Sequence, residues 1–167
     1  PDGERIIWRH FSESGMLADI YTMKLDGSDV CRLTDFGSMS WAPYYHPSGE
    51  YVIFHSNKQG FTNCELFLVD TQGQKEPMRV TFTDRFDGLP VFSPDGKQLA
   101  WTSGRTANGD SQLFLAAWNH EAAREALKLS VKRPESQAIP QPHPADKMKQ
   151  GNVPDPTRKQ LGESRNG

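Results

Sequence analysis

The sequence is poor in features that mark several functional classes. Its 167 residues include two cysteines, Cys31 and Cys64, which hold different places in the pattern described below and are expected to be separate thiols. No apolar run approaches the roughly 20 residues of a transmembrane helix. The net charge of −2 predicts no general affinity for nucleic acid. No segment has the spacing of a nucleophile elbow, a phosphate-binding loop or a paired-cysteine metal site, so we expect neither cofactor nor metal.

Aromatic residues are missing from the last part of the chain. All nine phenylalanines, four tryptophans and four tyrosines lie in residues 1–118, whereas six of the 12 prolines lie in residues 134–156. A proline-dense segment without aromatics buries too little surface to offset the entropy lost on ordering. Residues 130–167 are therefore predicted to be a disordered tail. Its basic charges are scattered, which favours a solvated segment over one bound to lipid or nucleic acid.

A short helix is expected between these two regions, over residues 119–129. Asn119 can cap its first turn, and Glu121 lies near the positive end of the helix dipole. Alanines at 122, 123 and 126 favour the helical conformation.

Residues 1–118 contain three copies of one pattern, spaced by 46 to 47 residues. A proline-x-glycine turn begins at Pro1, Pro47 and Pro94. A polar residue followed by an aliphatic and an aromatic one recurs as Asp19-Ile20-Tyr21, Glu65-Leu66-Phe67 and Gln112-Leu113-Phe114. An arginine-aliphatic-threonine triplet recurs at residues 32–34 and 79–81, but not in the third copy. A fixed period of roughly 40–50 residues with several short strands is typical of β-propeller blades.

The second copy shows the strands of one blade most clearly. Short runs of strand-forming residues, separated by turn residues, occupy residues 41–46, 51–54, 65–69 and 78–81. Trp8, Phe54 and Trp101 hold equivalent places in the second strand and are predicted to lie in the blade core. A β-sandwich would also contain hairpins, but it does not need its turns to recur in register. We therefore predict an all-β fold, a partial β-propeller of about three four-stranded antiparallel blades.

The repeat resembles that of the TolB-like β-propellers, with their WD40-like Pro-Asp-Gly turns. The resemblance rests on FSPDGKQLAW (residues 92–101) with QLF (112–114), and on DIYTMKLDGS (19–28) with RLT (32–34). It covers residues 1 to about 118. It implies a periplasmic or secreted setting in bacteria and a non-catalytic propeller that serves as a platform for protein partners. Similar repeats also form the non-catalytic propellers of peptidases and occur in some pectin-fragment lyases.

Three copies are fewer than the roughly four to eight blades of a closed propeller. We therefore expect the chain to be the C-terminal piece of a longer protein whose missing part supplies the remaining blades. The alternative is that two chains associate to close a ring. Two functions follow from the resemblance: a scaffold for envelope proteins, or the propeller of a larger hydrolase, such as a peptidase, whose catalytic domain lies elsewhere. A sugar-acid lyase is a weaker candidate because the sequence has no histidine cluster.

The beginning of each innermost strand is the best candidate for a binding surface, because these segments line the mouth of a propeller channel. Trp41 and Tyr44 correspond to Gly88 and Val91 in the next copy, so the common blade core does not require them. Large aromatics of this kind are candidates for partner contact, together with Asp87. Packing against the neighbouring blade is the alternative. His46 precedes a turn and is expected to support it, so we predict no catalytic residue in this chain.

Overall fold

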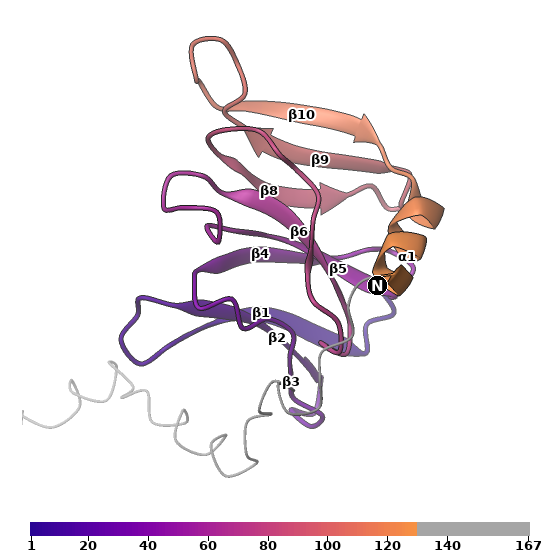
Figure 1. Cartoon of the computed structure of the whole chain (residues 1–167). Coiled ribbons are helices and arrows are strands. Elements are labelled where there is room, and N and C mark those ends of the chain that lie inside the picture. Colours follow the sequence, from indigo (N-terminus) through magenta and orange to yellow (C-terminus); the bar gives the residue numbers. More distant parts are fainter. Residues whose placement is uncertain (130–167) are drawn as a thin grey trace, which may run out of the picture.

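The computed structural model describes residues 1–129 and is built mainly of β-strands (Figure 1). The tail predicted over residues 130–167 lies outside the described residues. The strands and the helix are β1 (Arg5–Phe11), β2 (Ala18–Lys24), β3 (Cys31–Arg32), β4 (Ser40–Tyr45), β5 (Tyr51–Ser56), β6 (Glu65–Asp70), β7 (Met78–Arg79), β8 (Asp87–Phe92), β9 (Gln98–Ser103), β10 (Gln112–Ala117) and α1 (His120–Leu129).

Three antiparallel sheets follow one another along the chain, as the repeat predicts (Figure 1). Blade 1 is β1-β2-β3, blade 2 is β4-β5-β6-β7 and blade 3 is β8-β9-β10. The predicted all-β partial propeller is confirmed, with one four-stranded and two three-stranded blades in the described part. The first strand of blade 1, β1, corresponds to β5, the second strand of blade 2. After β10 the described chain continues into α1 instead of an outer strand.

The repeated glycine turns need a backbone conformation that other residues rarely adopt. Gly49 and Gly96 have φ angles of +74° and +69°, and each amide N–H bonds the carbonyl three residues earlier. Pro1, Pro47 and Pro94 line one pocket, so the three turns lie along one rim of the molecule.

The arginine-aliphatic-threonine triplet links the outer strand of blade 2, β7, to β6 through side-chain hydrogen bonds. The Arg79 guanidinium donates to Glu65 Oε1 at 2.5 Å, and its Nε donates to the Thr81 carbonyl at 2.7 Å. The Thr81 hydroxyl donates to the other Glu65 oxygen and accepts the Leu66 N–H at 2.9 Å. Glu65 is completely buried. The triplet is therefore an internal clamp for a buried carboxylate.

Blade 1 repeats this clamp and blade 3 does not. Arg32 pairs with Asp19 at 2.7 Å, and Thr34 bonds the same carboxylate at 2.9 Å. Gln112 holds the equivalent place at the start of β10 and is exposed. The absence of the triplet from the third copy thus matches the lack of an outer strand beside β10 within residues 1–129.

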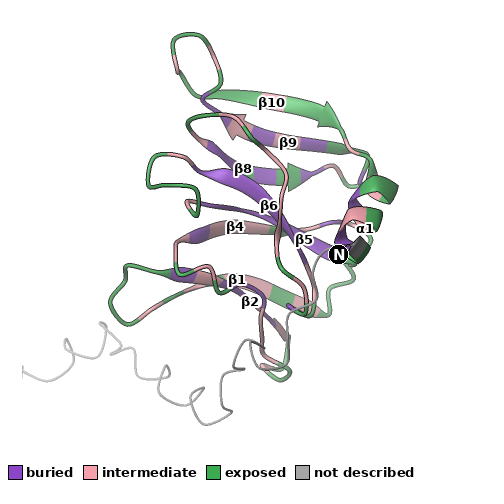
Figure 2. Ribbon diagram, in the orientation of Figure 1, coloured by how far each residue is buried: buried purple, intermediate pink, exposed green. Residues whose placement is uncertain are grey.

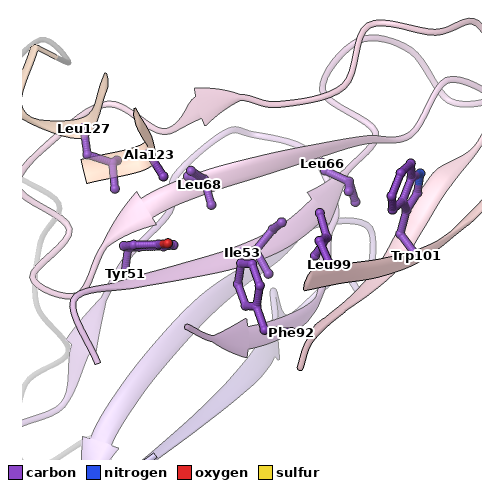
Figure 3. Close-up of a cluster of buried hydrophobic side chains, with 9 residues drawn as sticks. All are labelled: Tyr51, Ile53, Leu66, Leu68, Phe92, Leu99, Trp101, Ala123 and Leu127. Carbon is purple, nitrogen blue, oxygen red and sulfur yellow. The ribbon is translucent and has the colours of Figure 1, made fainter. Parts of the chain in front are cut away.

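Two apolar cores lie between the blades. Blade 2 contributes to both cores, because β5 and β6 are buried on both faces (Figure 2). The core between blades 1 and 2 contains Ile20, Leu33, Val52, Phe54, Phe67 and Val69. The core between blades 2 and 3 contains Tyr51, Ile53, Leu66, Leu68, Phe92, Leu99 and Trp101, together with Ala123 and Leu127 of α1 (Figure 3).

Helix α1 packs against this second core at the rim of the glycine turns. Asn119 caps it as predicted, its Oδ1 accepting the Ala122 N–H at 3.0 Å. The His120 ring lies 4.4 Å from the His46 ring, almost parallel to it. His46 supports its turn as expected, because its Nδ1 accepts the Ser48 N–H at 3.1 Å. In residues 1–129, no helix has the length and apolarity needed to cross a membrane.

Candidate functional site

A pocket of about 610 Å³ lies at the end of the blades where the inner strands β4 and β8 begin. It joins side chains from all three blades and from the loops that precede β6 and β8. The lining residues are Arg9, Trp41, Ala42, His55, Cys64, Phe86 and Leu89.

A bulge in each inner strand shapes this end of the blades. The register of β4 shifts between Trp41 and Tyr44, and that of β8 shifts between Gly88 and Val91. Within the bulges, Ala42 and Leu89 have φ angles of +46° and +56°. Such left-handed backbone is strained for residues with a side chain, and it occurs at equivalent places in two copies. The bulge is therefore a property of the repeat, and its left-handed residues, Ala42 and Leu89, both line the pocket.

Trp41 forms one wall of the pocket. Its ring stacks on His55, with 5.5 Å between the ring centroids and 17° between the planes. The Arg9 guanidinium lies 5.9 Å from the Trp41 ring and 4.4 Å from the Phe11 ring. Trp41 is half-buried, so part of its ring remains available to a ligand.

His55 is a buried, neutral imidazole at the base of the pocket. Burial lowers the pKa of His55 to about 4, and the positive charge of Arg9 contributes to the shift. Its Nδ1 accepts the Leu89 N–H at 3.3 Å, so the neutral ring carries its proton on Nε2. The ring thereby supports the bulge of β8.

The pocket carries one charge at neutral pH. Burial raises the pKa of the Cys64 thiol, which therefore stays protonated. Arg9 is exposed, and no carboxylate within residues 1–129 pairs with it. An unpaired guanidinium beside a tryptophan face is suited to a carboxylate that is attached to an apolar group. Cys31 and Cys64 are free thiols.

The structure does not gather the three residues predicted for the channel mouth. Trp41 lines the pocket described above. Tyr44 is 40% exposed and lines a second pocket, of about 470 Å³, beside Pro47 and Pro94. The centroid of its ring lies 6.4 Å from that of Phe92, so it also packs against blade 3.

Asp87 lies inside blade 3 and not on a contact surface. Its carboxylate accepts the Trp101 Nε1–H at 3.2 Å, two bonds from Arg105 at 3.0 Å and the Thr83 hydroxyl at 2.6 Å. Asp87 is completely buried. The expected partner contact is therefore corrected to a structural role, because these donors already satisfy both oxygens.

Sequence reasoning assigned no binding role to Arg9, Cys64, Phe86 or Leu89. These residues lie on strands and loops of different copies, and only the packing of the blades brings them together. The only hint in the sequence was that Ala42 and Leu89 hold equivalent places, 47 residues apart, in two copies of the repeat. Their side chains do not indicate that the backbone bulges there. Within residues 1–129, no three histidine, cysteine or acidic side chains are grouped closely enough to hold a metal ion.

Comparison with known proteins adds to this geometry. The family model of the TolB beta propeller domain matches residues 1–141. An uncharacterised protein of Agrobacterium fabrum is 32% identical over 112 residues, which are 60% of this chain and 36% of that protein. A TolB homologue of Chlorobium chlorochromatii is 26% identical over 52% of this chain and 29% of its own length. The chain thus spans about a third of these curated relatives.

Solved structures show the same arrangement of blades. A TolB candidate from Agrobacterium tumefaciens superimposes with a TM-score of 0.60 at 24% identity, over 70% of this chain and 43% of that one. TolB from Acinetobacter baumannii superimposes with a TM-score of 0.59 at 26% identity, over 72% of this chain and 29% of that one.

Proposed function

Because this chain belongs to the TolB beta propeller domain family, we propose that it is a non-catalytic scaffold that binds other proteins in the bacterial cell envelope. The setting is periplasmic or secreted, as the resemblance implies. The curated relatives include a protein named as a TolB homologue. The binding site is the pocket between the three blades, and its partner is a segment of another protein.

The observation that carries this proposal is the combination of Trp41 and Arg9 at the pocket. Aromatic residues and arginine are enriched among the residues that dominate the energetics of protein contacts: aromatic rings bury a large area at a small entropic cost, and arginine binds carboxylates through paired donors. Leu89 is 55% exposed beside them, although it is a large apolar residue. The chemistry of the pocket fits an acidic side chain or a terminal carboxylate next to an apolar residue. Tyr44, which lines the second pocket at the rim of the glycine turns, is a separate candidate contact for a protein partner.

The pocket side chains also lack the arrangement of a catalytic group. The Cys64 thiol is protonated, and the acceptor nitrogen of His55 is occupied by the Leu89 N–H. A nucleophile needs a base within hydrogen-bond reach and a third group that orients the base. The two carboxylates that follow lining residues in the sequence, Glu65 after Cys64 and Asp87 after Phe86, are already bound within blades 2 and 3. These contacts favour a binding role for the pocket over a catalytic one.

Photo-crosslinking from the pocket tests the proposal. A photoreactive p-benzoylphenylalanine replaces Trp41, and the chain is irradiated with envelope extract from the source bacterium. We expect one discrete adduct with another protein, at least about tenfold weaker when Arg9→Glu is added, because the reversed charge repels the carboxylate. The matched control places the probe at Phe61, which is 89% exposed but lies outside the pocket. Equal adducts from both positions, or none from position 41, would contradict the proposal.

A further inference from the structure

The two contacts between neighbouring blades share one plan but differ in one aromatic residue. Phe36, in the loop between β3 and β4, packs into the core between blades 1 and 2. Its ring centroid lies 5.1 Å from that of Phe67 and 5.9 Å from that of Phe54, and these two residues are cross-strand partners in β6 and β5. The Lys58 ammonium lies 3.9 Å from the centre of the Phe36 ring. Phe36 is therefore held by two rings and a cation.

The same two rings and cation recur between blades 2 and 3, each 47 residues later in the sequence. Trp101 and Phe114 are the corresponding cross-strand pair, with ring centroids 5.7 Å apart. Arg105 is the corresponding cation, and its guanidinium lies 5.1 Å and 5.2 Å from these two rings. The residue in the place of Phe36 is Thr83, which has no ring. The second contact thus has the surroundings of an aromatic side chain without an aromatic residue at that place in the repeat.

Two more residues are smaller at this second contact. Leu33 and Val69 are fully buried between blades 1 and 2. The residues in their places between blades 2 and 3 are Val80 and Ala116. Val80 is half-buried, and Ala116 is exposed on β10, which Figure 2 shows beside the buried β9. The side chains at these positions therefore fill less of the space between the blades than their counterparts do.

A pocket of about 330 Å³ remains at the second contact. Leu99 and Trp101, which project from β9 into this core, are larger than the residues in their places in blade 2, but they do not fill it (Figure 3). All the lining residues lie within residues 80–118, so the pocket is formed entirely by described parts of blades 2 and 3. Phe82 stands at its edge and is 72% exposed, which adds apolar surface at the entrance.

We propose that this pocket is a second binding site, which accepts the ring of a phenylalanine side chain from a partner protein. The occupant is inferred from Phe36, the group that the equivalent rings and cation hold in the first contact. The negative face of an aromatic ring complements the Arg105 guanidinium, which two hydrogen bonds to Asp87 keep in place. Contact with Trp101 also removes apolar area of the ring from water. The site shares no lining residue with the Trp41 pocket and is independent of what that pocket binds.

Fluorine NMR of the full chain, labelled with 5-fluorotryptophan, tests the site. The probe is N-acetylphenylalaninamide, an uncharged molecule that carries the proposed ring. We expect the Trp101 signal, assigned by its loss in a Trp101→Phe chain, to shift saturably with a dissociation constant of about 1 mM. The matched compound N-acetylleucinamide should bind at least about tenfold more weakly, because it has no ring to contact Trp101 and Arg105. A Trp101 signal that the probe leaves unchanged, or equal binding of the two compounds, would overturn the proposal.

Two variants fill the pocket from within the chain. Thr83→Phe supplies the missing ring, and Ala116→Leu narrows the space from β10, so each should weaken probe binding at least about tenfold. Ala116 is exposed, so Ala116→Leu keeps the fold even where Thr83→Phe, which removes the hydroxyl bonded to Asp87, does not. The control Ala117→Leu adds the same bulk on the opposite face of β10 and should leave the dissociation constant within about twofold. Undiminished binding by a folded Ala116→Leu chain, or an equal loss in the control, would contradict the site.

Discussion

Replacing Arg79 by methionine is expected to lower the free energy of unfolding by about 3 kcal/mol, which is a large part of the stability of a small domain. Arg79 is the charged partner of Glu65, whose side chain is completely buried. The substitution keeps the aliphatic part of the arginine and removes its charge and donors. Glu65 then remains a buried carboxylate with only the Thr81 hydroxyl as a side-chain donor. Urea unfolding followed by circular dichroism measures the change.

A double substitution separates the loss of the clamp from the cost of an unpaired charge. Glu65→Gln combined with Arg79→Met should recover most of the lost stability, because the buried group is then neutral. Gln112→Glu provides the matched control in blade 3, where the equivalent position is exposed and no triplet follows. That variant should change stability by less than about 0.5 kcal/mol. An Arg79→Met chain as stable as wild type would show that the clamp contributes little.

Acidification from pH 7 to pH 4 is expected to cost about 3 kcal/mol of stability through His55 alone. The ordinary pKa of a histidine is 6.5, and burial lowers that of His55 to about 4. The unfolded state therefore takes up a proton as the pH falls through 6.5, whereas the folded state does not until about pH 4. Stability is undiminished above pH 6.5 and is lost between these two values.

The variant His55→Gln isolates this contribution from those of other titrating groups. Glutamine can still accept the Leu89 N–H, but it does not take up a proton. The difference in unfolding free energy between wild type and variant, measured at several pH values, should change by about 3 kcal/mol from pH 7 to pH 4. The same difference at every pH would mean that His55 is accessible to protons in the folded state.

The fold was largely predictable because each blade repeats the same local rules. Proline and glycine at fixed positions set the turns, and the backbone of Gly49 and Gly96 has the left-handed conformation that this pattern requires. The alternating residues of β5 and β6 are apolar on both sides, which matches strands covered by two neighbouring blades. The arginine-aliphatic-threonine triplet could be recognised in the sequence because it recurs. That its arginine and threonine bind a buried carboxylate could not be predicted.

The site was less predictable because it depends on contacts between copies. Trp41 stood out as an aromatic residue that the repeat does not need, and it does line the pocket. Asp87 was chosen for its position at the start of an inner strand, but its partners Trp101 and Arg105 come from later in the copy and bury it. A bulge changes which side chains of a strand face inward, and the sequence alone does not show which ones these will be. Arg9 and His55 therefore became visible only with the blades packed together.

Amide hydrogen exchange along the whole chain tests the blade arrangement itself. Strands β5 and β6 are each paired on both edges and packed on both faces, whereas β10 is paired only with β9 in the described chain. We expect the amides of β5 and β6 to exchange only when the whole domain unfolds, and those of β10 to exchange faster, through local opening. Exchange from β10 that is as slow as from β5, or fast exchange from β5, would contradict a row of blades with blade 2 at its centre.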